Sequence, residues 1–275
     1  MLRPARILRP DGSIHTIDGV SCECVGVTNP GATDDAPRTF WQKVRLTGRL
    51  PRRGRGFWFG LAIDVLWPVV MLFSRPRWYG GRRIPRRGGV LLASNHLSFA
   101  DPVTMTAYVL SHGRIPRYLA KASLWRLPIF GSVMRGGRHI PVDRDAATAA
   151  DAYDAAVRSV RDGECVLFYP EATFTDDPDG WPMRGKTGLA RVALATGAPV
   201  IPIAHWGSQH LLPRRVPIPR LLPRKVIQIS AGAPVDLSDL TGAEPTREHL
   251  EIATTRIMAS ITTQLATIRG EVPPA

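Results

Sequence analysis

Short apolar runs alternate with helix-like segments through most of this chain of 275 residues, and this alternation constrains the fold more than any other feature. The apolar runs predict strands over 89–94, 117–121, 139–142, 165–169, 199–204 and 225–230. Helix-type spacing and terminating glycines predict helices over 102–111, 145–161, 187–195 and 247–268. The alternation predicts an α/β domain in which helices flank a mixed, mostly parallel sheet. In such sheets a site is expected where strands end and loops begin.

A second feature is an apolar run, residues 57–73, inside a strongly basic region. Residues 41–90 hold twelve Lys or Arg and a single acid, and the whole chain carries a net charge of +13. Nucleic-acid binders rarely wrap positive charge around so apolar a segment, so an anionic membrane surface is the expected partner and nucleic acid is not. The run is shorter than the about 20 residues that span a bilayer. It is therefore expected to lie in the headgroup region, with Trp58, Trp67 and Trp78 at the interface; a buried core helix is the alternative.

These patterns divide the chain into three segments. Residues 1–40 are expected to be a poorly ordered extension, residues 41–80 the membrane-associating segment, and residues 81–275 the α/β domain that carries the chemistry. The first forty residues show no secretory signal, so the expected location is the cell membrane, peripheral or monotopic, on the cytoplasmic side. The three cysteines have neither a disulfide nor a zinc spacing, and no metal or cofactor is expected.

A histidine and an aspartate five positions apart, His96 and Asp101, follow the predicted strand 89–94 and lead into a predicted helix. On one continuous helix this offset would separate them by about 140°. They can meet only if His96 lies in a loop and the helix starts near Asp101, a start that Pro102 favours. Asp101 would then be both N-cap and partner of the imidazole, a pair that removes a proton from an alcohol near neutral pH. The alternative is a simple helix cap beside a structural histidine.

Three further blocks accompany this pair, at 136–144, 168–175 and 199–202. The second reads Gly-Gly-Arg-His-Ile-Pro-Val-Asp-Arg, and the third reads Phe-Tyr-Pro-Glu-Ala-Thr-Phe-Thr. In this order and with these separations, the blocks resemble the glycerolipid acyltransferase family, typified by bacterial lysophosphatidic acid acyltransferases. The resemblance covers about residues 81–231. The other histidines, His205 among them, show no comparable partner and are expected to be structural.

The resemblance implies roles for the residues of the first two blocks. His96 and Asp101 would form the catalytic dyad, with Asn95 beside them as a substrate-binding residue. His96 would take the proton of an acceptor hydroxyl as it attacks a thioester carbonyl, with no acyl-enzyme; the sequence also lacks a Gly-x-Ser-x-Gly nucleophile turn. Arg144 would bind the acceptor phosphate, since a planar guanidinium makes paired hydrogen bonds to phosphate.

The third block departs from the family's usual Phe-Pro-Glu-Gly-Thr-Arg. Glu171 and Thr173 remain and are implied to contact the acceptor, but alanine stands at 172 and phenylalanine at 174. Alanine tolerates a positive φ poorly, so a tight turn here is in question. Arg184 and Lys186 are expected to replace the charge missing at 174. Residues 180–187 also match a nucleotide-binding loop pattern, but Pro182 removes a backbone donor and no predicted strand precedes it, so a chance match is favoured.

The implied activity is transfer of a fatty acyl group from acyl-CoA or acyl-carrier protein to lysophosphatidic acid, giving phosphatidic acid. The same chemistry on glycerol-3-phosphate, a lysophospholipid or a phosphoinositide is an alternative. A nucleotide-binding enzyme and a non-catalytic basic protein that binds membranes or nucleic acid are less favoured, because neither explains the four ordered blocks.

Overall fold

The computed structural model describes residues 6–8, 14–16, 54–143, 146–214, 218–241 and 244–274. Near the start of the chain, strands β1 (Arg6–Leu8) and β2 (Ile14–Thr16) pair antiparallel. They belong to a compact unit of their own, Met1–Gly31. Most of the stretch 1–40 lies outside the described residues, so its predicted disorder stays a prediction.

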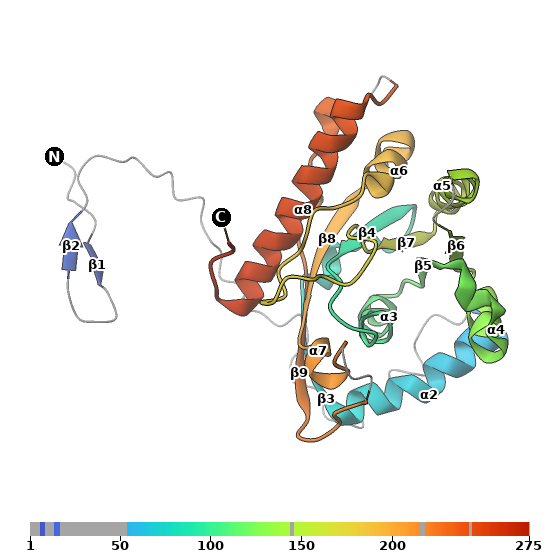
Figure 1. Ribbon diagram of the computed structural model, residues 1–275, viewed down its shortest axis with the longest axis horizontal. Coiled ribbons are helices and arrows are strands. Elements are labelled where there is room, and N and C mark those ends of the chain that lie inside the picture. Colours follow the sequence, from blue (N-terminus) through green and yellow to red (C-terminus); the bar gives the residue numbers. More distant parts are fainter. Residues whose placement is uncertain are drawn as a thin grey trace. The chain divides into compact units, whose positions relative to one another are not determined.

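The main unit is built on a seven-stranded sheet with the order β3-β9-β8-β4-β7-β5-β6 (Figure 1). Its strands are β3 (Ser74–Tyr79), β4 (Val90–Ser94), β5 (Pro116–Lys121), β6 (Ile140–Val142), β7 (Cys165–Phe168), β8 (Val200–Trp206) and β9 (Lys225–Ala231). Every neighbouring pair is parallel except β8 and β9. The predicted fold class, a mixed and mostly parallel sheet flanked by helices, is confirmed.

Helices cover both faces of this sheet. They are α2 (Phe57–Phe73), α3 (Asp101–Ser111), α4 (Pro128–Gly136), α5 (Ala146–Arg161), α6 (Gly188–Thr196), α7 (Ser208–Leu211) and α8 (Arg247–Arg269). Successive side chains of a strand point to opposite faces. Accordingly, Leu91 packs in the core under α5, α6 and α8, whereas Leu92 packs in the core under α3. Burial on both faces explains why these strands read as unbroken apolar runs.

In the main unit, β3, α4 and the short helix α7 have no counterpart among the predicted elements. β3 contains Arg75, Pro76 and Arg77, which do not form an apolar run, and both arginines are exposed. It pairs only with β9, and proline is tolerated in such an edge strand. Residues 74–79 therefore belong to the sheet, although the sequence pattern grouped them with the membrane-associating segment.

Helix α2 spans the apolar run predicted at 57–73, with one side packed in the protein. Its buried residues are Phe59, Ile63, Trp67, Val70 and Met71, in a cluster shared with α3. Trp67 is 2% exposed and packs against Trp78, so its predicted position at a membrane interface is wrong; Trp58 is 48% exposed. Among the described residues, none of the helices has the length and apolarity needed to cross a membrane.

Candidate active site

His96 and Asp101 meet at the junction between β4 and α3. β4 ends at Ser94, the loop 95–100 follows, and Asp101 is the first residue of α3 with Pro102 behind it. Ala100, not Asp101, is the N-cap residue. The Asp101 carboxylate instead turns back to accept from the backbone N–H groups of the loop before it, so its predicted role as a helix cap is wrong.

One carboxylate oxygen of Asp101 gathers three donors. His96 Nδ1 lies 2.8 Å from Oδ2, and the backbone N–H groups of Leu97 and Ser98 donate to the same oxygen at 2.5 and 2.9 Å. Because Nδ1 donates its proton to a carboxylate, the unshared electron pair of the neutral imidazole is on Nε2. The His96 side chain is 15% exposed, whereas that of Asp101 is fully buried. The pair therefore has the orientation of a general base backed by an anion.

The other oxygen of Asp101 faces two residues that the sequence patterns did not single out. The Ser208 hydroxyl donates to Oδ1, and His205 Nδ1 lies 3.3 Å from it. His205 is fully buried, and its Nε2 lies 3.0 Å from the Thr104 hydroxyl. Burial alone would raise the pKa of Asp101, but His205 and the hydrogen bond from His96 hold it well below its usual range. The carboxylate is thus kept ionised between two imidazoles.

Asn95 forms two hydrogen bonds with the main chain of His205. Its Nδ2 donates to the carbonyl of His205 at 2.9 Å, and its Oδ1 accepts from the N–H of His205 at 2.8 Å. Asn95 is 1% exposed. Because its whole amide is engaged with the main chain of β8, this geometry corrects the expected substrate contact: Asn95 positions His205.

Glu171 joins the third block to the catalytic loop. Its two oxygens accept from the N–H of His96 at 3.1 Å and of Met183 at 3.0 Å, and the residue is 2% exposed. Burial raises the pKa of Glu171 to about 7, against the effect of these two hydrogen bonds. Both oxygens accept from backbone N–H groups, so Glu171 joins the loop that contains His96 to the loop that contains Met183.

The turn after Glu171 has the left-handed conformation that was in question. Ala172 has a φ of 59°, and its N–H donates to the carbonyl of Tyr169 at 2.9 Å. For a residue with a Cβ this conformation costs roughly 1–2 kcal/mol. The tight turn therefore forms although alanine replaces glycine.

The remaining predicted site residues are less enclosed. Thr173 and Lys186 are exposed, and the N–H of Lys186 donates to the carbonyl of Pro170 at 2.7 Å, which places residue 186 beside the third block. Arg144 lies outside the described residues, and its phosphate contact stays a prediction. In the described stretch 169–187 no strand precedes the loop 180–187, so the context of a nucleotide-binding loop is missing.

Aromatic rings enclose the His96 imidazole. Tyr169 stacks on it at 4.0 Å between ring centroids, and Phe174 lies at 4.2 Å. Arg214 places its guanidinium 5.7 Å from the Phe174 ring and donates to the carbonyl of Thr175 at 2.7 Å. A cation from a distant loop thus stands over position 174, where the family pattern has arginine. Among the described residues no group of three or more His, Cys, Asp or Glu could hold a metal.

Part of the chain is similar to known acyltransferases. A family model described as Acyltransferase matches residues 75–206. A chloroplastic 1-acyl-sn-glycerol-3-phosphate acyltransferase of Brassica napus is 31% identical over 121 residues, which are 44% of this chain and 33% of that protein. An N-acylphosphatidylethanolamine synthase of Arabidopsis thaliana is 30% identical over 163 residues, which are 54% of this chain and 56% of that protein.

The fold also matches a solved structure. The 1-acyl-sn-glycerophosphate acyltransferase of Thermotoga maritima superposes with a TM-score of 0.55 at 18% identity, over 86% of this chain and 81% of that one. At this identity the match shows a common fold. The chain spans about a third of the length of the chloroplastic relatives that it matches.

Proposed function

We propose that this chain is a glycerolipid acyltransferase that transfers a fatty acyl group from a thioester to the free hydroxyl of lysophosphatidic acid, giving phosphatidic acid. Its similarity to acyltransferases supports this proposal. The donor thioester would be carried by coenzyme A or by acyl-carrier protein. The observation that carries this proposal is the hydrogen bond of 2.8 Å between His96 Nδ1 and the buried Asp101 carboxylate. Several relatives are named for the same reaction.

In the proposed mechanism, Nε2 of His96 removes the proton of the acceptor hydroxyl as its oxygen attacks the thioester carbonyl. The resulting imidazolium is stabilised by Asp101, whose negative charge is already in place and needs no rearrangement. When the tetrahedral intermediate collapses, the C–S bond breaks and the imidazolium returns its proton to the leaving thiolate. His96 is thereby regenerated, and no covalent acyl-enzyme forms.

Ser208, His205 and Asn95 act as positioning residues in this scheme. Ser208 and His205 hold the oxygen of Asp101 that faces away from His96, and Asn95 fixes the main chain of His205. They keep the carboxylate ionised and correctly turned. The tautomer of His96 depends on that orientation.

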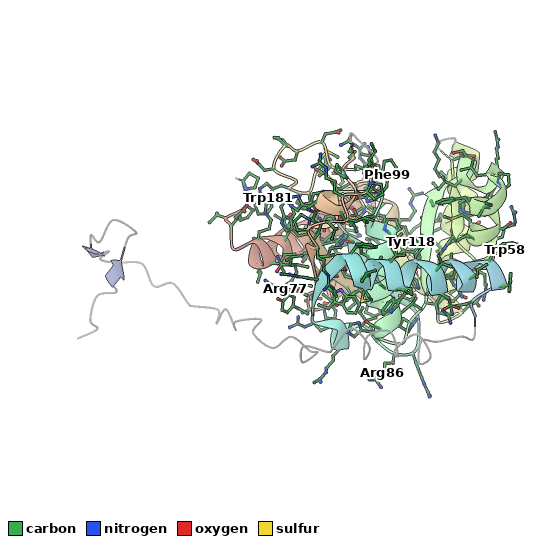
Figure 2. The ribbon with its side chains drawn as sticks, turned by 90° about the horizontal axis from the view of Figure 1, so that it is seen from below. Trp58, Arg77, Arg86, Phe99, Tyr118 and Trp181 are labelled. Carbon is green, nitrogen blue, oxygen red and sulfur yellow. The ribbon has the colours of Figure 1, made fainter. Side chains whose placement is uncertain are left out.

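We also propose that the protein attaches to the cytoplasmic face of the cell membrane through α2 and α4. Exposed apolar side chains of α2 are Phe57, Trp58, Leu61, Val65, Leu66, Val69 and Leu72. α4 adds Ile129 and Phe130, which are 74% and 54% exposed. Figure 2 shows α2 along one face of the molecule, with Trp58 near one end and the exposed Arg77 near the other. Apolar insertion beside basic residues suits an anionic bilayer surface.

Vesicle flotation tests the membrane contact. The double variant Val65→Asp/Ile129→Asp should leave anionic vesicles, because charged side chains resist insertion. Arg247→Asp, which changes an exposed residue that pairs with Glu251 at the start of α8, should still float. Equal flotation of all three proteins would count against α2 and α4 as the membrane contact.

Acylation assays test the reaction. We expect the wild-type protein, supplied with acyl-CoA or acyl-carrier protein, to acylate lysophosphatidate and His96→Ala to be inactive. Activity retained in the variant would exclude His96 as the base. Glycerol-3-phosphate, lysophosphatidylinositol and phosphatidylethanolamine belong in the acceptor panel, the last because one relative is named an N-acylphosphatidylethanolamine synthase. Transfer to glycerol-3-phosphate or lysophosphatidylinositol alone would correct the substrate and keep acylation of a hydroxyl. Transfer to phosphatidylethanolamine alone would replace the hydroxyl by an amine as the attacking group.

A further inference from the structure

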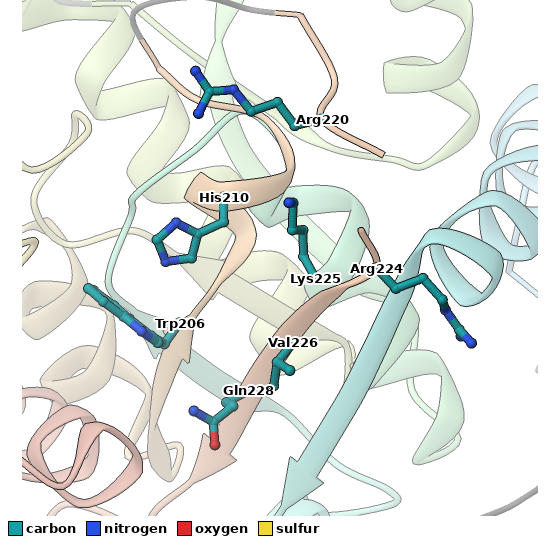
Figure 3. A pocket seen from close by; sticks show the side chains of 7 residues that line it. All are labelled: Trp206, His210, Arg220, Arg224, Lys225, Val226 and Gln228. Carbon is teal, nitrogen blue, oxygen red and sulfur yellow. The ribbon is translucent and has the colours of Figure 1, made fainter. Parts of the chain in front are cut away.

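A cavity of about 460 Å³ lies where β8 ends and β9 begins. Trp206, His210, Arg220, Lys225 and Gln228 line it (Figure 3). His205 points to Asp101, and the next residue along β8, Trp206, points to the other face because strand side chains alternate. Neither His96 nor Asp101 lines the cavity.

Positive charge dominates this cavity, whose lining contains no acid. Figure 3 shows the side chains of Lys225, His210 and Arg220 around the cavity, each pointing in a different direction. Arg224 turns away, and its guanidinium donates to the carbonyls of Met71 and Ser74 at 2.9 and 2.6 Å. Burial and then the charge of Lys225 lower the pKa of His210. Within the described residues, neither Arg220 nor Lys225 forms an ion pair, so their charges are available to a ligand.

The size of the cavity indicates what kind of ligand it holds. Small-molecule sites generally measure about 300–1,000 Å³. A cavity of this volume exceeds the needs of a single inorganic ion and suits a phosphate group together with the organic group that bears it. The indole of Trp206 offers that organic group a flat wall, and the amide of Gln228 offers it a polar wall.

Helix α7 connects the cavity to the catalytic residues. Ser208 at its start donates to Asp101, and the Ser98 hydroxyl donates to the carbonyl of Leu212, just after its end, at 2.6 Å. Between them His210 lines the cavity, and the N–H of Arg220 donates to the carbonyl of Leu211 at 2.7 Å. A ligand in the cavity is thus held by the same short helix that braces the dyad.

We propose that this cavity is a phosphate-binding site, in which Lys225, Arg220 and His210 hold a phosphate borne by a nucleotide-type thioester carrier or by a phospholipid headgroup. The choice between these two bearers rests on the proposed function, whereas phosphate binding itself does not. Charge-assisted hydrogen bonds to the phosphate oxygens would supply most of the affinity.

Direct binding measurements test this site without any turnover. Free coenzyme A is titrated calorimetrically, and phosphatidylcholine vesicles with and without phosphatidic acid are tested by co-sedimentation. Lys225→Gln and Arg220→Gln should each weaken binding about tenfold, or about 1.4 kcal/mol. Arg86→Gln, which removes the same charge from an exposed position outside the cavity, should bind like the wild type. His96→Ala should bind normally although it is inactive, which separates this test from that of the proposed reaction.

Each outcome decides the proposal. A loss of coenzyme A binding confined to the cavity variants supports the site and assigns it to the carrier, and a loss confined to the vesicles assigns it to a headgroup. Unchanged binding of both probes in Lys225→Gln and Arg220→Gln would overturn it, and so would an equal loss in Arg86→Gln. Circular dichroism shows whether Lys225→Gln still folds. If it does not, Arg220→Gln carries the test, because a change at an exposed residue should leave the fold intact.

Discussion

The variant Asp101→Asn keeps the size of the side chain and removes its charge. In the protein, Oδ2 accepts from His96 Nδ1 and two backbone N–H groups, whereas Oδ1 faces Ser208 and His205. The asparagine carbonyl can take the place of Oδ2, and its amide nitrogen can donate to the Ser208 hydroxyl, which also accepts. Since each hydrogen bond has a substitute, we expect the variant to fold.

What the variant loses is the attraction between the carboxylate and the imidazolium that forms on His96. With Nδ1 and Oδ2 2.8 Å apart, the two charge centres are separated by about 4 Å, which corresponds to about 4 kcal/mol at an effective dielectric constant of about 20. A barrier raised by this amount slows the reaction about 10³-fold. The neutral hydrogen bond from asparagine survives, so we expect kcat to fall between about 10² and about 10³-fold.

The assay follows release of the free thiol from acyl-CoA, with lysophosphatidate as acceptor. We expect the loss in kcat with little change in KM, because Asp101 is buried and does not touch the substrate. Asp239→Asn removes the same charge from an exposed acid paired with Arg256 and should leave kcat unchanged. A folded Asp101→Asn protein with kcat within about threefold of the wild type would refute the general-base role of the dyad.

Three further predictions concern the third block. Ala172→Gly should stabilise the protein by about 1 kcal/mol, because glycine adopts the φ of 59° without steric cost and the entropy of the more flexible unfolded chain cancels only part of that gain. We expect Tm to rise by about 2–4 °C. An unchanged or lower Tm would contradict this prediction. Burial raises the pKa of Glu171 to about 7, whereas the ordinary pKa of this group is 4.5. Between these two values the folded protein keeps a proton that the unfolded chain has released. The free energy of unfolding should therefore fall by up to about 3 kcal/mol between about pH 5 and about pH 8. Urea titrations should show this slope in the wild type and lose it in Glu171→Gln; the same slope in both proteins would rule Glu171 out as its source. Arg214→Gln should raise KM for a phosphorylated acceptor several-fold at constant kcat, since its guanidinium stands over the Phe174 ring, although it also pairs with Asp176. Arg191→Gln, which removes a guanidinium lying over Tyr153, is the control. An unchanged KM in Arg214→Gln would exclude the contact.

Local pattern determined much of the fold. Strands such as Val90–Ser94 and helices such as Arg247–Arg269 lie within one or two residues of their predicted ranges, because burial on two faces gives unbroken apolar runs and burial on one face gives helical spacing. The loop-to-helix junction between His96 and Asp101 was also predictable, because the two residues are five positions apart and Pro102 favours a helix start. Edge strand β3 escaped prediction because half-exposed positions do not require apolar residues.

Only the tertiary structure determined which residues surround Asp101. His205 and Ser208 reach it because β8 lies next to β4 in the sheet, and strand order is a property of the whole chain that no local spacing encodes. Because β8 lies next to β4, Asn95 forms its hydrogen bonds with the main chain of His205, whereas the sequence had suggested a contact with the substrate. The sequence by itself thus determined the imidazole and its carboxylate, since the two residues stand only five positions apart. The fold determined what keeps that carboxylate ionised, because its other partners come from more than a hundred residues away.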